Sequence, residues 1–168
     1  FLSINGLSPE TISSYADYIS KYQIGIIEGY PSTIFSLVVL LKKNNISLSC
    51  VKHIITTAEK LTHEQKYEIE NYFGCSIFDY YGSNEQSAFI KLTKAGYYVS
   101  DRKIAFIEIL NNQNMLCKEG EEGRLIVTSF TSRALPLIRY DIGDRCKVKK
   151  VSYSKNGFPS YQIDEIVG

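Results

Sequence analysis

The feature of this sequence that most constrains its fold is a change of hydrophobic pattern near residue 85. Up to that point, short apolar runs alternate with segments in which apolar residues recur at helical spacing. Parallel strands need a crossover between them, and a helix is the usual crossover. Beyond residue 85, strand-like runs follow one another without helices. We therefore predict an α/β fold, with a parallel sheet and covering helices followed by a small antiparallel β-barrel-like unit.

The predicted elements follow from caps and periodicity. A helix over 8–22 begins with Ser8 as N-cap and Pro9 at the first helical position, and a second begins at Pro31. A capping box at 62–65 opens a third helix, which Gly74 closes. The predicted strands are 24–27, 51–57, 76–80, 89–93, 97–100, 104–110, 124–130, 137–140 and 146–151. We expect two subdomains, residues 1–90 and 91–168.

Charge and cysteine content narrow the classes of partner. The 19 basic and 18 acidic residues nearly cancel, so no electrostatic field argues for nucleic acid or an anionic membrane. The longest apolar stretch, 34–41, is far shorter than the ~20 residues of a membrane helix. Four widely spaced cysteines include no C-x-x-C pair, which suits a reducing compartment. We predict a cytoplasmic protein without a membrane span that binds a small molecule or another protein.

The first candidate site is the segment 81–85, Tyr-Gly-Ser-Asn-Glu, which directly follows a predicted strand. Open α/β sheets bind ligands at the carboxyl ends of their strands. Gly82 permits close backbone approach, Tyr81 offers a flat face for a base, Asn84 offers an amide to a phosphate, and Glu85 is a hard oxygen ligand for Mg²⁺. The alternative is an ordinary Gly-Ser-Asn turn.

Two further segments are candidates for the same ligand. In 138–144, Gly143 is a turn residue, and the Asp144 carboxylate can accept hydrogen bonds from both hydroxyls of a ribose. The alternative is a β-hairpin turn with a solvated acid. Arg139 and Arg145 could meet a phosphate or form surface ion pairs. The small residues of 56–60 would let the backbone approach a base, although a plain strand-to-helix loop is equally consistent.

Taken in order, five segments resemble the motifs of the adenylate-forming enzymes, and within them the branch of phenylacetate-CoA ligases and CapK-like capsular-polysaccharide proteins. The matching segments are 28–32 (Glu-Gly-Tyr-Pro-Ser), 57–61 (Thr-Ala-Glu-Lys-Leu), 81–85, 120–128 and 136–144. The resemblance runs from about residue 20 to the end of the chain. It implies the fold of acyl-CoA synthetases, with ATP or AMP and Mg²⁺ as cofactors.

The resemblance also implies roles for individual residues. The implied nucleotide-binding residues are Ala58, Glu59, Lys60, Tyr81, Gly82 and Asp144, with Ala58, Glu59 and Tyr81 beside adenine and Asp144 on the ribose. Asn84 and Glu85 are the implied catalytic residues, on the α-phosphate and the magnesium respectively. Tyr30, Tyr80 and Ser83 are implied to line an acyl pocket. Two positions depart from the family: Asn84 replaces a Ser or Thr, and Lys60 replaces a proline.

By the same resemblance, the family's phosphate loop would lie upstream of this chain, and its mobile domain with the adenylation lysine would lie downstream. We therefore expect a fragment of an ATP-dependent carboxylate-activating ligase that is inactive alone. The intact protein would pass the acyl group to CoA or another acceptor, in connection with capsular polysaccharide. One alternative is a degenerate, non-catalytic scaffold homologue, for which Asn84 is the best evidence. Another is a stand-alone module that binds a sugar nucleotide.

Overall fold

The computed structural model describes residues 6–131 and 134–167. The chain forms two compact units, Phe1–Asp79 and Tyr80–Gly168. This division comes earlier than the boundary at residue 90 that the sequence predicted. The reason is that strand β3 (Ile77–Gly82) contributes to both units: its last residues, from Tyr80, pair antiparallel with β4. The segment 81–85 therefore belongs to the second unit.

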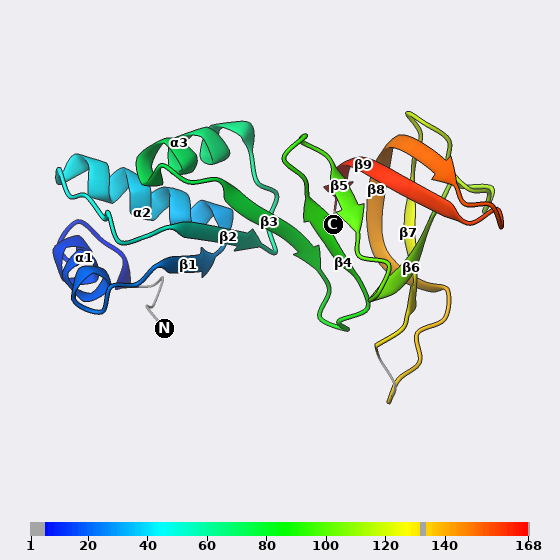
Figure 1. Cartoon of the computed structure of the whole chain (residues 1–168), viewed down its shortest axis with the longest axis horizontal. Coiled ribbons are helices and arrows are strands. Elements are labelled where there is room, and N and C mark those ends of the chain that lie inside the picture. The colour runs from blue at the N-terminus through cyan, green and yellow to red at the C-terminus, as the bar shows by residue number, and fades with distance from the viewer. Residues whose placement is uncertain (1–5, 132–133, 168) are drawn as a thin grey trace. The chain divides into compact units, whose positions relative to one another are not determined.

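The first unit has the predicted alternation of helices and strands (Figure 1). Its elements are α1 (Ile12–Lys21), β1 (Ile26–Gly29), α2 (Pro31–Lys43), β2 (His53–Thr57), α3 (His63–Phe73) and the start of β3. Strands β1 and β2 pair in parallel, with Ile26 opposite His53. The helices bury their apolar faces in one core, which includes Ile12, Val38 and Ile69.

Two helix starts show where capping rules succeed and fail. In α3, Thr62 and Gln65 form the predicted capping box, and Gly74 ends the helix with φ of 65°. The predicted helix α1 is present, but its predicted N-cap at Ser8 was wrong, because the helix begins at Ile12 and its N-cap is Thr11. The hydroxyl of Ser8 donates to the carboxylate of Glu10 over 2.6 Å, so it does not cap the helix.

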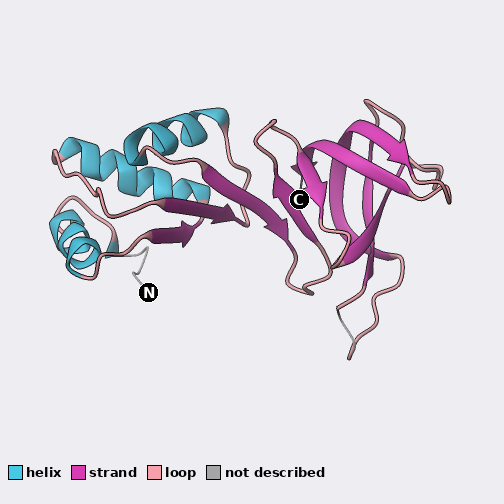
Figure 2. Ribbon diagram, in the orientation of Figure 1, coloured by secondary structure: helices cyan, strands magenta, loops and turns pink. Residues whose placement is uncertain are grey.

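The second unit contains strands and, among its described residues, no helix (Figure 2). After β3 come β4 (Phe89–Leu92), β5 (Tyr98–Ser100), β6 (Ala105–Leu110), β7 (Glu122–Ser129), β8 (Tyr140–Tyr153) and β9 (Pro159–Val167). They lie in the order β3-β4-β5-β9-β8-β7-β6, and every described pairing is antiparallel. Ile90, Leu125 and Ile163 are fully buried in their shared core. The predicted antiparallel unit is confirmed.

Strand β8 differs most from its prediction. The two short strands predicted over 137–140 and 146–151 are one continuous strand with irregular register against β7. Most of β9 was not predicted. None of the helices in the part of the chain that the structure describes has the length and apolar character needed to cross a membrane.

Candidate functional site

Two of the predicted site residues meet inside the second unit, although 63 positions separate them in the sequence. The hydroxyl of Tyr81, on β3, donates a hydrogen bond to Oδ2 of Asp144, on β8. Both residues are half-buried. The other carboxylate oxygen, Oδ1, has no hydrogen-bond partner among the described residues. The pair therefore offers an oriented carboxylate with one oxygen open to a ligand hydroxyl.

A bulge in β8 carries Asp144. In the ladder with β7, Arg124 lies opposite Arg145 and Ile126 lies opposite Asp141, so one residue of β7 faces three of β8, Ile142, Gly143 and Asp144. Such bulges redirect side chains and are common beside active sites. Gly143 has φ of 94°, a conformation that glycine adopts readily. The alternative of a hairpin turn at this position is wrong.

The environment of Tyr81 favours its neutral hydroxyl. Burial, then the hydrogen bond to Asp144 and the negative charge of that carboxylate, raise the pKa of Tyr81 well above its ordinary value. A protonated Tyr81 is the form that can donate to Asp144. The hydrogen bond therefore persists throughout the neutral pH range.

We predict that Tyr81 ionises only above the range of a free tyrosine, whose pKa is about 10. Because folding favours the neutral form, the stabilising contribution of Tyr81 is complete below about pH 10 and is lost as the pH rises through the folded pKa. An alkaline titration of tyrosinate absorbance, compared between the wild type and Tyr81→Phe, measures this. The two curves should coincide near pH 10 and diverge above it; divergence near pH 10 would contradict the prediction.

The rest of segment 81–85 forms a turn that is closed by its own side chains. The hydroxyls of Ser83 and the buried Ser87 lie 2.9 Å apart, and the Gln86 N–H donates to the Ser83 carbonyl over 2.9 Å. Asn84 and Glu85 are exposed. Among the described residues, no group of three His, Cys, Asp or Glu side chains is arranged as a metal site. A Mg²⁺ bound by Glu85 would complete its coordination with water or with oxygens of a ligand.

Tyr80, on β3, lies in the second unit, with its ring centroid 5.1 Å from that of Phe89. The other predicted site residues, Tyr30 and the loop 58–60, lie in the first unit. Tyr30 is exposed and precedes α2. In the loop after β2, Ala58 has φ of 66°, and Ala58, Glu59 and Lys60 are exposed. The Glu59 carboxylate accepts the backbone N–H of Ser32 over 3.2 Å, at the N-terminal end of α2, where the helix dipole favours an anion. In this structure Glu59 thus ties the loop to α2.

Backbone strain accompanies the predicted motifs. Six described residues other than glycine have positive φ, and three of them are Ala58, Gln86 and Arg139. Each lies inside or directly after a predicted motif. Strained backbone costs of order 1–3 kcal/mol per residue and concentrates at ligand sites. Sequence reasoning missed this signal because φ is not readable from residue types.

The structure shows the ion-pair and hydrogen-bond partners of several side chains whose partners the sequence could not determine. Arg139 pairs with Glu108 through two hydrogen bonds of 3.0 and 3.2 Å, and Arg145 pairs with Glu122 over 2.6 Å. The ion-pair alternative for both arginines is confirmed. In the first unit, the buried Thr56 hydroxyl, on β2, donates to Oδ1 of the buried Asp79, on β3, over 2.5 Å. Sequence reasoning missed this buried pair.

Comparison with known proteins identifies the class to which the fold corresponds. The chain superposes on a 2-hydroxyisobutyryl-CoA ligase, solved with an acyl-AMP and CoA, with a TM-score of 0.74 at 16% identity, over 97% of this chain and 37% of that one. An anthranilate CoA ligase in complex with anthranoyl-AMP gives a TM-score of 0.65 at 17% identity, over 94% of this chain and 32% of that one. The chain has the fold of a segment of acyl-CoA ligases.

A curated relative is similar in sequence as well. The chain is 30% identical over 165 residues to protein CapK of Staphylococcus aureus, a match that covers 95% of this chain and 34% of CapK. No protein-family model matches the chain. The predicted resemblance is thereby confirmed at two levels: the sequence is similar to CapK, and the fold is that of acyl-CoA ligases. The chain spans about a third of the length of the curated relative that it matches.

Proposed function

We propose that this chain is the nucleotide-anchoring part of an ATP-dependent ligase that activates a carboxylic acid as an acyl-adenylate. The observation that carries the proposal is the hydrogen bond between Tyr81 and Asp144, which joins two motifs named from sequence. The fold shared with acyl-CoA ligases and the similarity to CapK support it. In this proposal Asp144 binds the ribose, and the face of Tyr81 lies against adenine.

The reaction explains why these groups would be needed. A carboxylate oxygen attacks the α-phosphorus of ATP, the bond to the β-phosphate breaks, and pyrophosphate leaves with the negative charge. Mg²⁺ would neutralise that charge, and one or two carboxylates with substrate phosphates are its usual ligands, so the exposed Glu85 fits this role. Asn84 donates an amide hydrogen to the α-phosphate. By the family resemblance, Gly82 would contact the nucleotide, and Tyr80 and Ser83 the acyl group. The same resemblance gives Ala58, Glu59 and Lys60 of the first unit a role in nucleotide binding, and Tyr30 a role in acyl binding.

We also propose an acyl acceptor and a cellular setting. CoA is the first candidate acceptor, because a neighbour of the same fold was solved with CoA. We further propose a place in capsular polysaccharide synthesis, in line with the similarity to CapK, and a cytoplasmic location. This chain supplies a ribose anchor and one metal ligand, so we expect the 168 residues alone to be inactive.

The asparagine at position 84, where the family has Ser or Thr, favours a second candidate, a scaffold homologue without catalysis. Calorimetric titration of the complete gene product that carries this chain separates the candidates. A non-hydrolysable acyl-adenylate analogue should bind at least about tenfold more tightly than AMP, because transition-state and intermediate analogues exceed substrates by ~10² or more. A UDP-sugar should not bind. Binding of AMP and analogue with equal affinity would favour the scaffold, and selective binding of the UDP-sugar would favour the sugar-nucleotide module.

A further inference from the structure

We infer that Asp141 is a positioning residue for Asp144: it holds the bulge of β8 in the shape that aims the Asp144 carboxylate, and Arg124 holds Asp141 in place. Neither residue was singled out for this role by the sequence motifs. The consequence for nucleotide binding rests on the proposed function. The geometric part concerns only residues of the second unit and does not depend on it.

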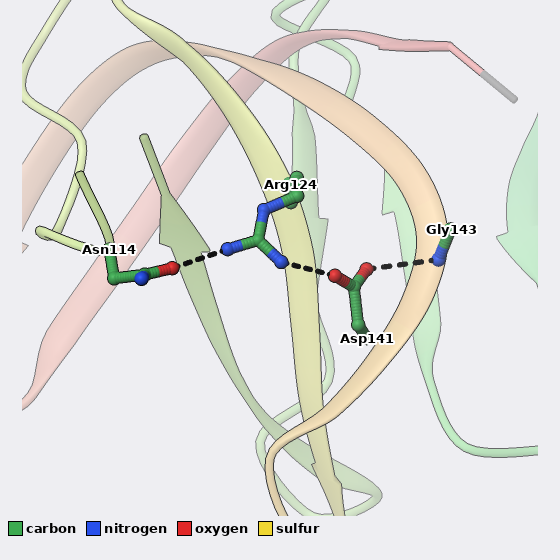
Figure 3. Close-up of polar contacts among 4 residues, drawn as sticks. All are labelled: Asn114, Arg124, Asp141 and Gly143. Atoms are coloured by element: carbon green, nitrogen blue, oxygen red, sulfur yellow. Dashed lines mark hydrogen bonds and ion pairs between the residues drawn. The ribbon is translucent and has the colours of Figure 1, made fainter. Parts of the chain in front are cut away.

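The contacts form a chain from β7 to the bulge (Figure 3). The Arg124 guanidinium lies between two acceptors: its Nη2 donates to Oδ1 of Asn114 over 2.5 Å, and its Nη1 donates to Oδ2 of Asp141. The other oxygen of Asp141, Oδ1, accepts the backbone N–H of Gly143 over 3.2 Å. One carboxylate therefore binds a side chain of β7 with one oxygen and the backbone of the bulge with the other.

The Asp141 carboxylate stabilises this region in two ways. Bulged residues lose their partners in the strand ladder, and Asp141 supplies an acceptor for the Gly143 N–H. Arg124 and Arg145 also lie directly opposite each other on β7 and β8, where like charges are destabilising. The carboxylate of Asp141 offsets the charge of Arg124 at this position. Gly143 immediately precedes Asp144, so its backbone direction determines where the Asp144 side chain points.

The exposure of the Arg124–Asp141 ion pair indicates that it shapes the bulge and contributes little to the stability of the whole unit. The Arg124 and Asp141 side chains keep 36% and 41% of their accessible surface. Exposed ion pairs contribute little to global stability. A change at Asp141 is therefore expected to alter the position of Asp144 while the unit stays folded, and this separates positioning from general stabilisation.

The first test needs no ligand. Tyr81 reports on Asp144, because Asp144 is its acceptor. In the full chain, Asp141→Ala should lower the ionisation midpoint of Tyr81 by about one pH unit, since a displaced carboxylate no longer disfavours tyrosinate. Asp141→Asn keeps an oxygen that can accept the Gly143 N–H. Its Tyr81 midpoint should therefore lie between those of Asp141→Ala and the wild type. The matched control is Asp164→Ala, which breaks another exposed cross-strand pair, with Lys149. Equal midpoints in Asp141→Ala and wild type, or an equal shift in the control, would overturn the inference.

The second test uses an acyl-adenylate analogue and its 2′-deoxy form as probes on the complete gene product. Asp141→Ala should weaken binding of the ribose form by about tenfold, as expected for a displaced positioning contact, and reduce its advantage over the deoxy form. In an Asp144→Ala background, Asp141→Ala should cause no further loss. An additive loss in the double variant would overturn the inference. If the wild type binds neither probe, the proposed function fails, and the Tyr81 midpoint still decides the inference.

Discussion

The Gly123→Ala variant is expected to destabilise the second unit by about 3 kcal/mol, at the upper end of the cost of overpacking a core. A Cβ at Gly123 would lie 2.5 Å from Sγ of Cys117 and 2.5 Å from the carbonyl oxygen of Leu110. Leu110 ends β6, and its carbonyl carbon would lie at 2.7 Å. Because backbone atoms are among these neighbours, β6 and β7 would have to separate.

The free energy of unfolding from urea titration measures the effect. Gly82→Ala is the control, because a Cβ there meets its nearest atom, on the Tyr80 ring, at 3.7 Å, which is an ordinary contact. The control should lose about 1 kcal/mol or less. Equal losses in the two variants would show that β6 and β7 do not approach as described. The close approach of β6 and β7 at Gly123 is a packing reason for a glycine in the segment 120–128. From the sequence alone, this segment was known only as a match to a family motif.

The Asp144→Ala variant is expected to weaken nucleotide binding by about 100-fold in the complete gene product. Hydrogen bonds to charged groups contribute roughly 1.5–3 kcal/mol each, and about 1.4 kcal/mol corresponds to a factor of ten. In the proposed site, the carboxylate loses its bonds to the ribose. Calorimetric titration with an acyl-adenylate analogue gives the ratio of dissociation constants.

Tyr81→Phe serves as the control for Asp144→Ala. It removes the same hydrogen bond within the protein and leaves both the carboxylate and an aromatic face. We expect a loss of only about tenfold in this variant, which corresponds to a single hydrogen bond. Equal losses in the two variants would mean that Asp144 acts through Tyr81 rather than on the ligand, and the role assigned to its carboxylate would be wrong.

Local signals in the sequence predicted the first unit well. The alternating pattern located its helices and strands, and the Thr62–Gln65 capping box and Gly74 marked both ends of α3. At α1 the same rules failed, because the Ser8 hydroxyl is taken by Glu10. A short polar side chain has several nearby partners, and residue types do not determine which one it binds.

The second unit shows a different limit. Gly143 was compatible with either a hairpin turn or a bulge, because both use positive φ. The register of β7 against β8 decides between them, and register depends on contacts between distant residues. The family resemblance placed Tyr81 and Asp144 on the same nucleotide, but it did not predict the hydrogen bond between them. The ion pair of Arg124 with Asp141 had no sequence signal.

ATP–pyrophosphate exchange by the complete gene product tests adenylation directly, across a panel of carboxylic acids and with Asp144→Ala and Glu85→Gln beside the wild type. We expect exchange that depends on one class of acid and falls at least about 100-fold in both variants, because the ribose contact positions the nucleotide and the metal stabilises the charge that develops on pyrophosphate. Absence of exchange with every acid, from a folded protein, would contradict adenylation and favour the scaffold.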